Sequence, residues 1–194
     1  MLMQVVVSGL TLGAIYALIA VGFTVVFATN RLINFAHGEF VMAGGMLYAW
    51  FTGVHHLPIA LAFPLAALVS GLLGWLVYTL GLAGVDRDNH IAQVMITLGA
   101  GITLKGAAQV FLGKETLFPP AFSGVAPVAL GPVSVPSQTL WIAGGLLAIL
   151  VGLHALMRYT RLGAAMRAVS INSFAAILMG VSPGRAAAVA FLLA

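Results

Sequence analysis

An uninterrupted run of 24 uncharged residues, from Val5 to Ala28, constrains the fold of this chain more than any other feature. As an α-helix rising about 1.5 Å per residue it is about 36 Å long, enough to cross the roughly 30 Å hydrocarbon core of a bilayer. No basic segment precedes the run, and no small-x-small cleavage site follows it. The sequence therefore predicts a retained membrane span rather than a signal peptide.

Composition extends this prediction to the whole chain. Hydrophobic residues make up 62% of the 194 residues and charged residues only 6%, and the mean hydropathy is +1.13. Such values indicate a polytopic membrane protein. Without cysteine there is neither a disulfide framework nor thiolate chemistry. The net charge of +4 is better explained by signals of membrane orientation than by a surface for nucleic acid.

Apolar runs and chain breakers predict an all-α bundle of five complete spans and the start of a sixth, in a single transmembrane domain over residues 1–194. The predicted spans are 4–28, 34–53, 57–84, 91–113 and 139–157, and the sixth begins near Pro183. Only nine apolar residues, Ala186 to Ala194, follow in that sixth span. Because a span needs about 20 residues, we expect the chain to be C-terminally incomplete.

Basic residues predict the orientation of these spans. The hydrophilic stretch 158–183 and the residues just after it hold four arginines and no acidic residue: Arg158, Arg161, Arg167 and Arg185. This pattern indicates a cytoplasmic loop. By alternation, Arg31 and the loop from Asp86 to His90, with Arg87, are predicted inside. The N-terminus and the loop 114–138, whose five prolines exclude regular helix, are predicted outside.

Two predicted spans carry ridges of small residues four positions apart: Gly9, Gly13 and Ala17 in the first, and Gly144, Ala148 and Gly152 in the fifth. Ridges of this kind let a neighbouring backbone approach closely, so we interpret them as packing faces rather than hinges.

The segment Ile33–Phe40 places an amide, an imidazole and a carboxylate between apolar runs. A carboxylate at membrane depth must be paired, protonated or in contact with water, which makes Glu39 a functional candidate. Gly38 and Asn34 suit a break in the helix whose freed backbone groups face a polar solute. In the fourth span, Lys105 and Gln109 lie four residues apart on one helical face. The predicted substrate pathway is Asn34, His37, Gly38, Glu39, Lys105 and Gln109.

Other interpretations of this segment stay open. Glu39 can pair with His37, Arg31 or Lys105, and it also fits a solvated helix end or one half of a structural ion pair. A metal site is not expected, because residues i and i+2 of a helix do not converge and no further ligand of suitable spacing follows. The sequence has no Gly-x-Ser-x-Gly, His-Glu-x-x-His or phosphate-binding glycine-rich motif. We therefore predict neither a hydrolase nor an ATPase.

A short helix is predicted within the cytoplasmic stretch, from Phe174 to Met179. Ser170, Asn172 or Ser173 can cap it, and Gly180 can end it in the left-handed conformation. Ser182 and Pro183 are typical of the cap and first turn of the next span. The helix is either an ordinary connector or a docking element with an exposed apolar face.

Four motifs, spread along the whole chain, carry a resemblance to a known family. They are Gly9-x-x-x-Gly13-Ala14-x-Tyr16-Ala17-Leu18, the segment Ile33–Glu39, Thr97-Leu98-Gly99, and Thr160-Arg161-Leu162-Gly163-x-x-x-Arg167-Ala168 followed by Ala175-Ala176-x-x-x-Gly180. With these motifs the chain resembles the membrane-spanning permease subunit of branched-chain amino acid ABC importers.

The resemblance implies a multi-pass protein of the bacterial cytoplasmic (inner) membrane. It implies pairing with a second, homologous permease, two ATP-binding subunits that dock on the helix at 171–180, and an extracytoplasmic solute-binding protein. ATP and Mg would be used by those partner subunits, and this chain would bind no cofactor and no metal. The residues implied in coupling are Arg161, Gly163, Arg167, Phe174, Ala175, Ala176 and Gly180. Phe174 and Asn172 stand where relatives commonly carry acidic residues, which makes this docking surface less charged.

The leading hypothesis is therefore a permease subunit that moves branched-chain or related amino acids by alternating access, driven by ATP hydrolysis in its partners. An ion- or proton-coupled carrier that uses Glu39 is the alternative. Dependence of uptake on ATP or on an ion gradient distinguishes them. The sequence does not choose the solute, because related solutes differ by a few pocket contacts.

Overall fold

The computed structural model describes residues 2–86, 89–115, 118–123, 128–130 and 133–194. Four helices in these ranges are long and apolar enough to cross a membrane. They are α1 (Leu2–Asn30), α3 (Ile59–Val77) with its π-helical extension η1 (Tyr78–Leu82), α4 (His90–Phe111) and α5 (Ser137–Tyr159). The prediction of an all-α, multi-span fold is thus confirmed.

The second predicted span is the helix α2 (His37–Gly53), which is shorter than expected. At 17 residues it is about 26 Å long, less than the roughly 30 Å of the bilayer core. It begins at His37 instead of at residue 34 because the N–H of Ala36 donates to Oδ1 of Asn34 at 3.1 Å. This side-chain turn keeps residues 34–36 out of the helix.

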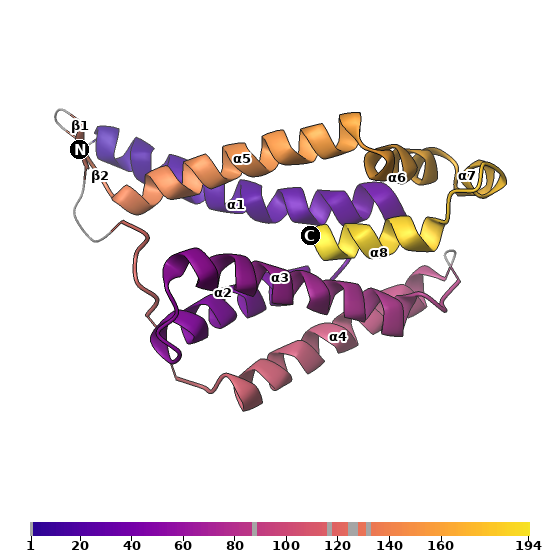
Figure 1. The fold of residues 1–194 in the computed structure, drawn as a ribbon, viewed down its shortest axis with the longest axis horizontal. Coiled ribbons are helices and arrows are strands. Elements are labelled where there is room, and N and C mark those ends of the chain that lie inside the picture. Colours follow the sequence, from indigo (N-terminus) through magenta and orange to yellow (C-terminus); the bar gives the residue numbers. More distant parts are fainter. Residues whose placement is uncertain (1, 87–88, 116–117, 124–127, 131–132) are drawn as a thin grey trace.

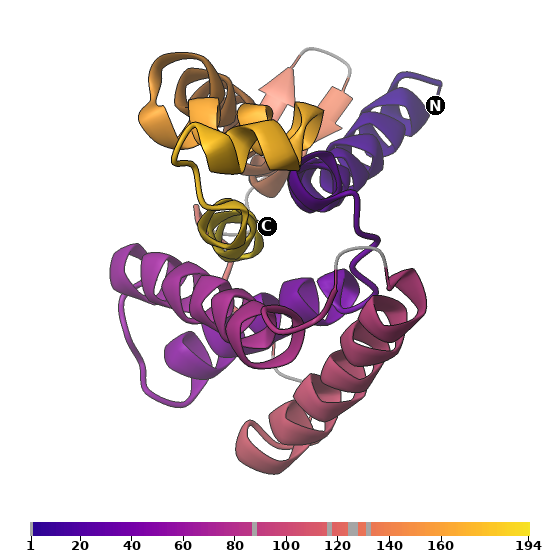
Figure 2. The same cartoon turned by 90° about the vertical axis from the view of Figure 1, so that its right-hand side faces the viewer.

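The helices form two layers with α8 (Pro183–Leu193) between them (Figures 1 and 2). One layer holds α1, α5 and α6 (Arg161–Ile171), and the other holds α2, α3 and α4. Helix α8 packs on α1, α3 and α6. The N-terminal end of α1 and the strands lie at one end of the bundle, whereas α6, α7 (Ser173–Leu178), the end of η1 and the start of α4 lie at the other (Figure 1).

This arrangement groups the predicted outer and inner loops at opposite ends of the bundle. Which end faces the cytoplasm stays a prediction, and Arg87 lies outside the described residues. The loop 114–138 contains no helix before Ser137 in its described part, but it holds a strand pair that the sequence did not indicate. Strands β1 (Val128–Leu130) and β2 (Val133–Val135) pair antiparallel.

Close backbone packing occurs at glycines other than those predicted. A Cβ on Gly71 of α3 would lie 2.7 Å from the backbone oxygen of Leu192, and one on Gly74 would overlap that of Phe191. Helix α8 is therefore seated directly on α3. At the four glycines of the predicted ridges, nothing lies within 4 Å of such a Cβ: Gly9, Gly13, Gly144 and Gly152. The predicted ridges are not packing faces within the described part of this chain.

The apolar interior divides into two buried clusters. One gathers residues of α1, α2, η1 and α8 with the α1–α2 connection, and includes Phe40, Leu82 and Phe191. The other joins α1 to α6, α7 and α8, and includes Met166 and Ala176. Helix α5 contributes no buried residue, so it lies at the edge of the bundle.

Candidate functional site

The α1–α2 connection and the first residue of α2 bury two polar side chains of the motif. Asn34 is 2% exposed and His37 is 5% exposed. Nε2 of His37 lies 2.9 Å from the carbonyl oxygen of Ile19, and because a carbonyl only accepts, Nε2 carries the hydrogen. Gly22 of α1 makes room for the ring, since a Cβ there would lie 2.8 Å from Cε1 of His37. The imidazole thus ties α2 to α1.

Two polar atoms of this connection have no hydrogen-bond partner although they are buried: Nδ1 of His37 and Nδ2 of Asn34. An unpaired buried polar atom costs about 1–3 kcal/mol, so such atoms mark places where water or a ligand is expected. Gly38, in contrast, is exposed, and nothing lies within 4 Å of a Cβ added at this position.

Glu39 faces α4 but is not paired there. It is half-buried, and a Cβ added at Gly101 of α4 would lie 3.3 Å from Cγ of Glu39. Lys105 and Gln109 follow on the same helix one and two turns later, and both are exposed. The structure describes both Glu39 and Lys105, and it shows no ion pair between them. The structure brings Glu39 to the start of this face, and a shared polar lining with Lys105 and Gln109 stays a prediction.

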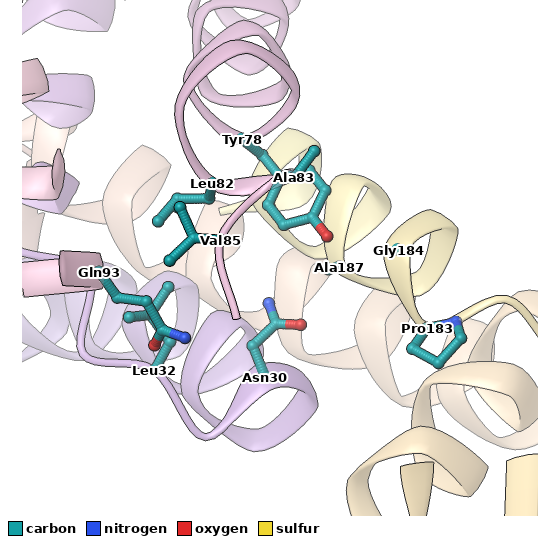
Figure 3. A pocket seen from close by; sticks show the side chains of 10 residues that line it. All are labelled: Asn30, Leu32, Tyr78, Leu82, Ala83, Val85, Gln93, Pro183, Gly184 and Ala187. Carbon is teal, nitrogen blue, oxygen red and sulfur yellow. The ribbon is translucent and has the colours of Figure 1, made fainter. Parts of the chain in front are cut away.

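A cavity of about 280 Å³, called here the inner cavity, lies between the end of α1, the end of η1 and the starts of α4 and α8 (Figure 3). Its polar lining comes from Asn30, Tyr78 and Gln93. Both polar side-chain atoms of Asn30 are buried without a partner. Sequence reasoning missed Asn30, because a lone Asn at the end of a span reads as an ordinary helix end.

A second cavity of about 540 Å³, the outer cavity, lies between α2, α3, α5 and the end of α8. Three aromatic side chains, those of Tyr48, Phe63 and Phe122, form part of its wall. Their rings lie 5.6 to 6.4 Å apart. Ser70 and Gln138 supply polar groups; the hydroxyl of Ser70 donates to the carbonyl of Phe40 at 2.9 Å. No charged side chain lines either cavity among the described residues.

An aromatic and aliphatic layer, called here the barrier, separates the two cavities. Leu32 and Leu82 line the inner cavity, Phe40 and Phe191 line the outer one, and all four belong to one buried cluster. Phe191 is 1% exposed, and its ring centroid lies 5.4 Å from that of Tyr78. Phe191 thus touches the wall of both cavities, a role that its place in a short terminal apolar run did not reveal.

The helices at the other candidate site, α6 and α7, form a small helical corner. The predicted short helix is confirmed as α7: Oδ1 of Asn172 accepts from the N–H of Ala175 at 3.0 Å, and Gly180 has φ +79°. Ser182 caps α8, accepting from the N–H of Arg185 at 3.4 Å. Helix α6 was not predicted, although Thr160 caps it with an acceptor for the N–H of Gly163.

The predicted coupling residues divide between the interior and the surface of this corner. Gly163 and Ala176 are buried, and a Cβ on Gly163 would overlap the backbone of Leu156 and Met157. The remaining five are all exposed: Arg161, Arg167, Phe174, Ala175 and Gly180. The side chains of Phe174, Ile177, Leu178 and Met179 are all more than half exposed. This apolar surface has no partner within the described part of the chain.

Comparisons with known proteins agree on one family. The family model described as "branched-chain amino acid transport system / permease component" matches residues 5–194. The high-affinity branched-chain amino acid transport system permease protein LivH of Escherichia coli is 28% identical over 207 residues, which cover 98% of this chain and 66% of that protein. LivH of Salmonella typhimurium is 28% identical, and BraD of Pseudomonas aeruginosa 26%, with the same coverage. The chain therefore spans just under two thirds of these relatives' length. No solved structure matches it.

Proposed function

Because the chain belongs to the family of permease components of branched-chain amino acid transport systems, we propose that it forms the membrane-spanning part of an ATP-driven importer for branched-chain or related amino acids. Its four long apolar helices make it a multi-pass membrane protein. In this proposal two partner subunits hydrolyse ATP with Mg, a second homologous permease completes the pathway, and an extracytoplasmic binding protein delivers the solute. The chain itself is a transport component and not an enzyme.

The observation that carries this proposal is the pair of cavities on either side of the barrier. Alternating access requires a solute chamber that opens to one side at a time. The outer cavity reaches Phe191 from one end of the bundle, and the inner cavity reaches Tyr78, against which Phe191 packs, from the other. In this proposal, movement of α8 relative to α3 changes which cavity Phe191 closes. This geometry supports a gated pathway between α1, α2, α3 and α8.

The chemistry of the cavities supports a net-neutral solute with an apolar side chain. Aromatic and small residues of the outer cavity suit such a side chain, and the amide and hydroxyl groups suit its polar end. The unpaired amide of Asn30 offers both a donor and an acceptor in the inner cavity. The buried polar atoms of Asn34 and His37 lie in the connection that follows Leu32 of that cavity, which supports a role of the motif in the pathway.

The proposal is tested by uptake measurements on the complete permease, reconstituted with its ATP-binding subunits in liposomes. Uptake of radiolabelled leucine should require ATP and Mg on the side of the ATP-binding subunits and the binding protein on the opposite side. A proton ionophore should leave it unchanged. Uptake that proceeds without ATP, or that the ionophore abolishes, would contradict the proposal.

A second candidate, the proton-coupled carrier, is favoured by one observation: the half-buried Glu39 carboxylate has no ion-pair partner among the described residues. We predict that Glu39→Gln, which keeps size and removes the titratable group, lowers ATP-driven uptake less than threefold. A carrier that binds its coupling proton at Glu39 would lose uptake altogether. The measurement is the initial uptake rate with and without an imposed pH gradient, with Glu115→Gln, on the connection after α4, as the control.

The exposed apolar surface of α7 supports docking of the ATP-binding subunits. We predict that Phe174→Ser, which removes a side chain that is 70% exposed, lowers solute-stimulated ATP hydrolysis at least tenfold and leaves the thermal midpoint of unfolding unchanged. Val54→Ser is the matched control, because Val54 is 51% exposed but follows α2 at the opposite end of the bundle. Equal ATP hydrolysis in both variants would remove α7 from the docking surface.

A further inference from the structure

A third concave surface lies on the side of α1 that faces away from the two cavities. It is a groove of about 480 Å³ between α1, α5 and α6. Along α1 it is lined by Ala20, Thr24 and Ala28, which share one helical face. The opposite face of α1 is covered: a Cβ on Gly22 would lie 2.8 Å from the His37 ring, and Val26 belongs to the same buried cluster as Phe191. The groove is therefore separate from the proposed solute pathway.

The groove is apolar over nearly its whole length. Leu153 and Met157 of α5 form one wall, and Met166 of α6 closes one end. The hydroxyl of Thr24 donates to the carbonyl oxygen of Ala20 at 2.7 Å, so its hydrogen is already bonded within α1. A surface of this kind at membrane depth suits a hydrocarbon chain that runs parallel to the helices.

Cationic groups gather only at the end of the groove next to α6. Arg167 lines it there together with Ser170. A second guanidinium, that of Arg31, donates from Nη2 to the carbonyl oxygen of Ser170 at 3.4 Å. The sequence has no acidic residue after Glu115, and no ion pair within the described residues involves either arginine. Within the described residues, both guanidinium groups are therefore free of ion pairs and available to an anion from another molecule.

From this order of groups we infer that the groove binds an anionic phospholipid, with one acyl chain against α1 and α5 and the phosphate beside Arg167 and Arg31. Basic residues at the end of an apolar surface between membrane helices are typical of sites for anionic headgroups. A phospholipid carries its charge and its hydrocarbon in this same order along its length. A helix of a protein partner would match this groove only if it were apolar along its length and carried an acidic residue at the one depth that faces Arg167.

The test compares retention of phosphatidylglycerol and phosphatidylcholine by the purified chain, measured by native mass spectrometry after delipidation and titration with each lipid. We expect the chain to retain phosphatidylglycerol at least fivefold more, with the preference falling as salt is raised. Arg167→Gln should abolish the preference, and Arg167→Lys should keep most of it. Arg158→Gln is the matched control, because Arg158 lies over the ring of Tyr159 and does not line the groove.

A second set of variants tests the apolar part of the site. Ala20→Leu and Ala28→Leu fill the groove and should lower retention of phosphatidylglycerol at least threefold, whereas Ala143→Leu, at an exposed position of α5 outside the groove, should not. Circular dichroism identifies any variant that has lost helix. Equal retention of both lipids by the wild-type chain, or unchanged retention in the filling variants, overturns the inference. The second result would leave a protein helix as the occupant of the groove.

Discussion

Gly74→Val is expected to displace α8 from α3 and to abolish uptake. A Cβ at position 74 would overlap the backbone oxygen of Phe191 and lie 3.9 Å from the ring of Phe40. Because the obstacle is backbone rather than the end of a flexible side chain, relief requires movement of the whole helix. Overpacking of this kind costs about 1–3 kcal/mol, and we expect the upper end of that range.

Gly144→Val is the matched control for this prediction. Gly144 is also a glycine within a long apolar helix, but nothing lies within 4 Å of a Cβ at that position. Gly144→Val should lower the thermal midpoint of unfolding by less than half of the decrease caused by Gly74→Val. The same is expected of the uptake rate. Similar losses in the two variants would mean that valine harms these helices generally and that α8 does not depend on Gly74.

The helices of this chain were predictable because their signals are local. A charge-free run is long enough to span the bilayer wherever it packs, and Asn172, Gly180 and Ser182 specify helix ends through contacts with their own neighbours. The same locality explains α2. The turn before α2 is made by the Asn34 side chain, which the sequence shows. The choice between helix and turn at residues 34–36, however, depends on a single hydrogen bond.

The cavities were not predictable, since they depend on which faces of the helices meet. Gly71 and Gly74 follow no four-residue repeat, yet α8 packs on them, whereas the regular ridge at Gly9 and Gly13 is open. Asn30 acquires its meaning only from the approach of η1, α4 and α8 around it. Lys105 and Gln109 share a helical face, but sequence spacing alone does not tell whether that face turns inward, and here it is exposed.

Removing the ring of Phe191 is expected to join the two cavities. Phe191 is 1% exposed between Tyr78 and Phe40, so Phe191→Ala leaves a void where the barrier stood. Truncation of a buried Phe costs about 3–5 kcal/mol of stability. We also predict a leak: proteoliposomes that hold the Phe191→Ala permease should release preloaded leucine without ATP at least tenfold faster than wild type.

Phe191→Leu and Phe111→Ala separate this leak from simple unfolding. The leucine side chain keeps much of the buried volume, so Phe191→Leu should remain closed at a stability cost of about 1.5 kcal/mol or less. Phe111 is 79% exposed on α4, and its truncation should change neither the release rate nor the thermal midpoint appreciably. If Phe191→Ala stays folded and releases preloaded leucine no faster than wild type, the barrier lies elsewhere. The proposed alternation of the two cavities about Phe191 then has to be abandoned. If release rises in Phe191→Ala but not in Phe191→Leu, side-chain volume at this one position closes the pathway.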